Sequence, residues 1–207
     1  MPITGRTPKE CFDTFRDHLA KLLADVLGEG QSSYVAMTQG ADPLQRDLQL
    51  GPRGVDYVAF PSGHVGAAYV YLAQDLRVFK CDAGFQLKTH QYWYKLFDVQ
   101  PELELEPLFR WEYVSEVPAG KEWCRHHFQI GKVPAGDRRE ALRLPLGTGE
   151  LDLNRVHVPT GFVLIEYVLR FLITELKIEP ATSEWQSVLK ESENRFFREF
   201  SAKTSTP

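Results

Sequence analysis

Apolar side chains near the start of the chain recur at the spacing of one helix face. They are Phe12, Phe15, Leu19, Leu22, Leu23 and Val26. Thr7-Pro8-Lys9-Glu10 has the composition of a capped helix start, and Gly28 supplies a stop. The pattern therefore predicts an amphipathic helix over residues 7–28 that packs its Phe and Leu face on a sheet.

From residue 33 to residue 158 the pattern changes to short runs rich in aromatic and β-branched residues, separated by Gly, Pro and Asp turns. The strand candidates are residues 33–38, 55–60, 69–72, 76–80, 85–97, 108–114, 123–133 and 151–158. Residues 39–54 and 134–149 have the composition of loops. Because the strands follow one another through short connections, we expect antiparallel meander pairing.

The last quarter of the chain has helical character. Residues 162–178 are apolar nearly all round, which is typical of a buried helix, and Pro180 ends this segment. On its narrow polar stripe Glu166 and Arg170 lie four residues apart and are expected to pair. Thr182 or Ser183 caps a final helix, so residues 160–201 form a helical C-terminal part. The sequence thus predicts one α+β domain over residues 1–207, an antiparallel sheet packed by an N-terminal helix and two C-terminal helices.

Composition excludes several classes of protein. The 207 residues carry 24 basic and 28 acidic side chains, a net charge of −4, whereas binding of nucleic acid through bulk charge needs the opposite sign. Three widely spaced cysteines give neither a disulfide framework nor a zinc motif. No apolar run opens the chain, and the most apolar stretch is too short for a bilayer. We expect a cytoplasmic protein that does not bind membranes. Dinucleotide, P-loop, zincin and nucleophile-elbow motifs are absent, so no cofactor is expected.

Four β segments carry the polar residues that bear on chemistry. Alternation places Arg110 and Glu112 on one face of their strand, and it directs His127 to a polar face while His126 points inward. Tyr92 and Tyr94 share a face of the long strand before them. If these strands are neighbours, one sheet face gathers Tyr92, Tyr94, Arg110, Glu112, His127 and His157.

Such a set suits acid-base chemistry on a phosphodiester. Histidine titrates nearest neutrality, a tyrosine or carboxylate can orient it, and the arginine fork can hold phosphate oxygens. These groups could cleave RNA without a metal, because the ribose 2′-hydroxyl supplies the nucleophile. The candidate catalytic residues are Arg110, Glu112, His126, His127, His157 and Tyr94.

Other interpretations remain open at this point, including that the protein is not an enzyme. Arg110 and Glu112 could form an ion pair on a solvated face. A metal-dependent hydrolase would need three of His90, His126, His127, His157 and Glu112 to converge, although adjacent histidines of a strand face apart. A non-catalytic interaction module could offer the acidic segment 102–106 and its aromatic residues to a partner protein.

Residues 88–132 resemble the TumE-like proteins, toxin-like members of bacterial toxin–antitoxin systems. The resemblance lies in Tyr92-Trp93-Tyr94, Phe109-Arg110-Trp111-Glu112-Tyr113 and His126-His127. Trp111-Glu112 stands where that family favours Tyr-Asp. The resemblance implies a bacterial cytosolic toxin-like or defence-associated protein with nuclease activity, a cognate antitoxin as partner, and roles for Arg110, Glu112, His126 and His127.

Overall fold

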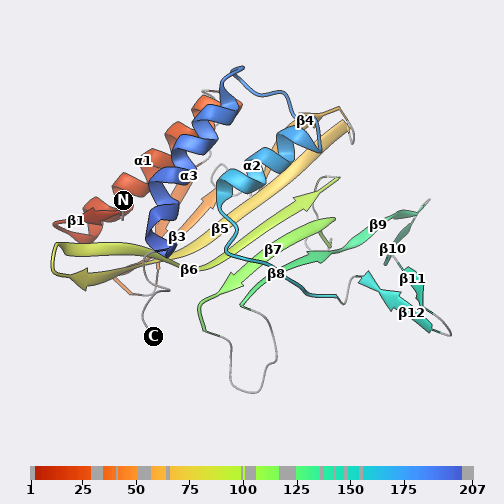
Figure 1. The fold of residues 1–207 in the computed structure, drawn as a ribbon, viewed down its shortest axis with the longest axis horizontal. Helices are drawn as coiled ribbons and strands as arrows, with labels where there is room; N and C mark the ends of the chain where they lie inside the picture. Colours follow the sequence, from red (N-terminus) through yellow and green to blue (C-terminus); the bar gives the residue numbers. More distant parts are fainter. Residues whose placement is uncertain are drawn as a thin grey trace.

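The fold is one large antiparallel sheet with three helices on one of its faces (Figure 1). The computed structural model describes residues 3–28, 35–40, 42–50, 57–63, 66–98, 100, 106–116, 125–135, 138–141, 143–146, 149–153 and 156–201. The predicted α+β class, with an N-terminal helix and two C-terminal helices, is confirmed. No helix in the described part of the chain combines the length and apolar character that a membrane crossing requires.

Helix α1 (Pro8–Leu27) forms where the sequence predicts it. The Thr7 hydroxyl accepts from the Glu10 amide at 3.2 Å, and the Glu10 carboxylate accepts from the Arg6 amide at 2.8 Å, so two amides at the helix start are satisfied. Gly28 ends the helix with a φ of 111°, which favours glycine. The predicted apolar face packs on the sheet and includes the fully buried Leu23 and Val26.

The main sheet has the strand order β13-β8-β7-β6-β5-β3-β2. Its members are β2 (Val35–Gln39), β3 (Gln45–Leu50), β5 (Gly66–Cys81), β6 (Gly84–Phe97), β7 (Phe109–Val114), β8 (His126–Ile130) and β13 (Val158–Pro159). Strand β1 (Thr4–Gly5) pairs with β6, and β4 (Val58–Ser62) pairs with β5. Every pairing is antiparallel, and β5 with β6 forms a long hairpin at the centre.

Two predicted loops contain strands. Within residues 39–54, β3 pairs with β5; its Leu48 is buried and the Arg46 guanidinium lies 4.9 Å from the centre of the Phe12 ring. A polar residue thus occupies a core-facing position, which hides the alternation of this strand. Within residues 134–149 lie parts of two short hairpins, β9 (Lys132–Ala135) with β10 (Arg138–Ala141), and β11 (Arg143–Leu146) with β12 (Gly149–Asp152).

The predicted final strand over residues 151–158 is also wrong. Strand β12 ends at Asp152 and belongs to a two-stranded sheet, whereas β13 begins at Val158 and extends the main sheet. The pattern of apolar residues does not reveal that the chain changes its partner between these two strands.

Helix α2 (Ile165–Thr174) begins later than predicted, and α3 (Trp185–Ser201) follows it. The amide of Val163 donates to the Tyr92 hydroxyl at 2.9 Å, and Leu164 is extended. The predicted pairing of Glu166 with Arg170 does not form. Arg170 instead donates to Glu193 of α3 at 2.5 Å, and Glu166 accepts from Ser192 of α3.

Candidate active site

The register of β6, β7 and β8 decides which side chains share a face of the sheet. Tyr94 lies opposite Trp111, so both face α2, where the Trp111 ring centre is 5.4 Å from that of Phe171. Glu112 lies opposite His127. We call the face turned away from the helices the open face. Its residues on these strands are Trp93, Lys95, Arg110, Glu112, His127 and Gln129.

Four predicted site residues, Arg110, Glu112, His127 and His157, converge on the open face. His127 Nε2 lies 3.1 Å from Glu112 Oε2, and Arg110 Nη1 lies 4.0 Å from Glu112 Oε1. The His127 and His157 ring centres are 4.7 Å apart. Gln129 also lies on this face, where its Oε1 accepts from Arg110 Nε at 2.6 Å. Arg110, Glu112, His127, Gln129 and His157 are called the polar cluster below.

Strand β13 brings His157 to the cluster from a distant part of the sequence. Val158 and Pro159 pair with Phe128 and His127 of β8. The Thr160 amide then donates to the His126 carbonyl at 3.1 Å, which anchors the chain just after the pairing. A two-residue strand is thus enough to set one histidine ring against another.

Exposure increases from the base of the polar cluster to its rim. His127 is 3% exposed, whereas the side chains of Glu112 and Arg110 are 21% and 32% exposed and His157 is exposed. His157 and Arg110 are therefore the members of the polar cluster most accessible from solvent. His127 is buried behind His157.

The hydrogen bond to Glu112 selects the form of His127. An ionised carboxylate can only accept, so the proton of a neutral His127 ring sits on Nε2 and the lone pair on Nδ1. At His157, partial burial is the main cause that lowers the pKa, with Arg110 and the protonated form of His127 as further causes, while Glu112 opposes them. A pKa below 6.5 leaves His157 neutral near pH 7 and able to accept a proton.

Tyr92 and Tyr94 do not join the polar cluster, and the prediction that they share its face is wrong. Strand alternation was predicted correctly for each strand, but it does not fix how two strands are aligned. The register sets Tyr94 opposite Trp111 rather than Arg110. Tyr94 is buried on the helix-covered face, stacks on Tyr92 at 4.4 Å and accepts from Gln74 Nε2 at 2.5 Å.

His126 also lies outside the polar cluster, on the helix-covered face, as the predicted inward orientation requires. Its ring stacks on Tyr113 with centres 4.4 Å apart. Burial is the main cause that lowers the pKa of His126. Its Nδ1 has no hydrogen-bond partner among the described residues. The sheet therefore separates the His126 ring from the polar cluster.

Of the other interpretations, the ion pair between Arg110 and Glu112 is present, with Nη1 and Oε1 4.0 Å apart. No group of three His, Cys, Asp or Glu side chains in the described ranges is placed to hold a metal ion. Of the acidic segment 102–106, only Glu106 falls within the described residues.

Lys95 of β6 was not predicted as a site residue, although alternation puts it on the face opposite Tyr94. It lies opposite both Arg110 and Tyr71, and its Nζ is 5.4 Å from the Tyr71 ring centre. Trp93 lies opposite Glu112. The open face beside the polar cluster thus carries two aromatic rings, of Trp93 and Tyr71, and one cationic group, of Lys95.

Comparisons of the chain with family models, curated proteins and solved structures found no match. We therefore infer the function from the residues of the polar cluster.

Proposed function

We propose that this protein cleaves RNA phosphodiester bonds without a metal ion, using the 2′-hydroxyl of the substrate as nucleophile. The observation that carries the proposal is the contact between the exposed His157 ring and the buried His127 ring. Glu112 is hydrogen-bonded to His127, and Arg110 lies beside Glu112. An acceptor for the hydroxyl proton and a cation for the phosphate are the two groups that this reaction needs most.

Each group has one role in the proposed reaction. Neutral His157 takes the proton of the 2′-hydroxyl, whose oxygen attacks the adjacent phosphorus. The bond from phosphorus to the 5′-oxygen breaks, and that oxygen takes a proton from water. The products are a 2′,3′-cyclic phosphate and a 5′-hydroxyl. Arg110 offsets the charge that builds up on the phosphate oxygens, and the Glu112–His127 pair positions His157.

The surroundings of the polar cluster support a single-stranded substrate. Aromatic side chains stack on bases of any sequence, and cationic groups follow the phosphates. Trp93 and Tyr71 offer half-buried rings, and Lys95 lies beside Arg110. The resemblance to TumE-like proteins also favours RNA. We include in the proposal a toxin-like or defence-associated role in the bacterial cytoplasm, restrained by a cognate antitoxin.

The test is cleavage of a labelled single-stranded RNA by the purified full chain in the presence of EDTA. We expect a 2′,3′-cyclic phosphate product, and no cleavage of a matched DNA strand. The variant His157→Gln should reduce kcat/KM by about 10²- to 10⁴-fold, the usual contribution of one acid-base group.

The matched control is His90→Gln, a histidine of β6 that contacts Ser115 and lies outside the polar cluster. It should leave the rate within about twofold of the wild type, the range of a surface change that removes no substrate contact. Absence of RNA cleavage by the wild type, or equal rates for the two histidine variants, would contradict the proposal.

A further inference from the structure

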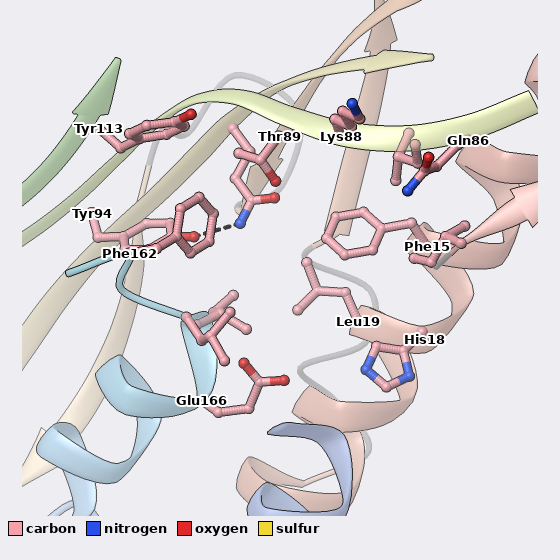
Figure 2. A pocket seen from close by; sticks show the side chains of 15 residues that line it. Phe15, His18, Leu19, Gln86, Lys88, Thr89, Tyr94, Tyr113, Phe162 and Glu166 are labelled. Carbon is pink, nitrogen blue, oxygen red and sulfur yellow. Dashed lines mark hydrogen bonds between the residues drawn. The ribbon is translucent and has the colours of Figure 1, made fainter. Parts of the chain in front are cut away.

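A cavity of about 260 Å³ lies on the helix-covered face, between α1, the start of α2 and the central strands. Phe162 lies on one side of it and Phe15 on the other, with Tyr113 nearby (Figure 2). The side chains of Gln74, Tyr94 and Glu166 add polar groups to this apolar wall. The cavity is separated from the polar cluster by the sheet, so it has no part in the proposed cleavage.

Gln74 leaves an unused hydrogen-bond acceptor at the cavity. The side chain is 6% exposed and its Nε2 donates to the Tyr94 hydroxyl, but its Oε1 has no hydrogen-bond partner. A buried amide oxygen without a donor is rare, because it has lost its water and gained nothing in return. A ligand with an N–H group would satisfy it.

Glu166 adds a carboxyl group to the same cavity. It is 2% exposed, and its Oε1 accepts from the Ser192 hydroxyl. Ser192 Oγ lies 3.0 Å from His18 Nε2. Burial lowers the pKa of His18 to about 4, with Arg195 and Lys21 as further causes, so this ring is neutral near pH 7 and brings no positive charge.

The nearby cations are engaged elsewhere. Arg170, one helical turn after Glu166, pairs with Glu193. The Lys88 ammonium lies 5.1 Å from the centre of the Phe79 ring, and Figure 2 shows it across the cavity from Glu166. Among the described residues Glu166 therefore has a hydroxyl partner but no cationic one.

We propose that this cavity binds a small arylalkylamine, an aromatic ring system that carries a protonated amine on a short side chain. The ring system packs among Phe15, Phe162 and Tyr113, and the protonated nitrogen donates to Glu166 and to Gln74 Oε1. An ammonium group is also attracted to aromatic faces. Since a dry cavity of about 150 Å³ accommodates benzene, the larger volume here suits a bicyclic ring with a short side chain.

Three probes with one ring system and different charges test the proposal by isothermal titration of the full chain. Tryptamine carries an ammonium group, indole is neutral and indole-3-propionate carries a carboxylate. We expect tryptamine to bind at least about tenfold more tightly than indole, as a charge-assisted hydrogen bond is stronger than a neutral one, and the propionate to bind most weakly. Equal binding of all three, tighter binding of the propionate, or no binding would overturn the assignment.

Variants separate the roles of the two polar residues. Glu166→Gln should weaken the binding of tryptamine about tenfold and leave the binding of indole unchanged, since only the charge of residue 166 is lost. The matched control is Glu193→Gln, on α3, which pairs with Arg170 and does not line the cavity. It should leave tryptamine binding unchanged, and an equal loss in both variants would contradict a contact with Glu166. If Glu166→Gln fails to fold, Gln74→Met provides the second test and should weaken the binding of tryptamine and of indole alike.

Discussion

At the scale of single residues, the titration of His157 reports on its neighbours. Arg110 is among the causes that lower the pKa of this histidine, and Glu112 acts against them. Replacing Arg110 by Met should therefore raise the pKa of His157 toward 6.5, whereas Glu112→Gln should lower it further. The proposed base works only when neutral, so cleavage should be lost as the pH falls through this pKa, at higher pH in the arginine variant and at lower pH in the glutamate variant.

Proton NMR of the imidazole signals measures these shifts without relying on activity. Burial, Arg195 and Lys21 lower the pKa of His18 to about 4, and none of these causes involves the polar cluster, so the pKa of His18 should stay constant in both variants and serve as the internal reference. A change of the His157 pKa in the same direction in both variants would contradict the placement of Arg110 and Glu112 beside this histidine.

Tyr94 gives a second prediction at this scale, because the structure removes it from the polar cluster. Tyr94→Phe should leave RNA cleavage unchanged. It should destabilise the fold by about 1–3 kcal/mol, since the buried amide nitrogen of Gln74 loses its partner. Urea unfolding monitored by tryptophan fluorescence measures the loss. A large fall in kcat/KM with unchanged stability would mean that Tyr94 acts in catalysis after all.

At the scale of elements, the sequence predicts what depends on the alternation within one strand, and not what depends on the alignment of two. His126 and His127 alternate as expected, and so do Arg110 and Trp111. The register between β6 and β7 places Tyr94 and Arg110 on opposite faces of the sheet. It is stabilised by aromatic side chains that pack under α2, such as Trp111 against Phe171. That packing involves residues about sixty positions apart, so no local pattern contains it.

Strand β3 and helix α2 show the same limit in single elements. Gln45–Leu50 is too polar to be recognised as a strand, and it forms because β5 offers a partner to its first five residues. The start of α2 is displaced by the Tyr92 hydroxyl, which accepts from the Val163 amide. In both places a contact with a distant part of the chain outweighs the secondary-structure propensity of the local sequence.

The end of β8 gives a prediction about an element boundary. A side-chain carbon at Gly131 would lie 1.7 Å from the Pro107 carbonyl oxygen, which is backbone and cannot rotate away. Gly131→Ala should therefore destabilise the fold by at least about 2 kcal/mol, toward the upper part of the range for overpacking. It should also weaken cleavage, since Gln129 and His127 belong to this strand.

Gly161 is the matched control, because a side-chain carbon there meets nothing within 4 Å. Gly161→Ala should change the free energy of unfolding by less than about 0.5 kcal/mol, as is usual for surface substitutions. Thermal unfolding by circular dichroism compares the two variants. Equal stability would show that the loop before β7 yields to the added methyl group.

At the scale of the whole molecule, the placement of all three helices on one face leaves the other face to the polar cluster and its flanking aromatic and basic side chains. The net charge of −4 means that the chain as a whole repels RNA. Attraction must therefore come from a few local cations, among them Arg110 of the polar cluster and Lys95 beside it. Each contact with a phosphate releases counterions, which makes affinity depend on salt concentration.

The salt dependence of RNA binding then counts those contacts. For a single strand, the logarithm of the association constant should fall with the logarithm of salt concentration with a slope of about −0.7 per contact, so two contacts give about −1.4. Fluorescence anisotropy with the His157→Gln variant measures this without cleavage. Lys95→Gln should bring the slope to about −0.7, and Lys21→Gln on α1, whose partner is Asp25, should leave it unchanged. A slope several times steeper would place the main RNA contacts outside the open face.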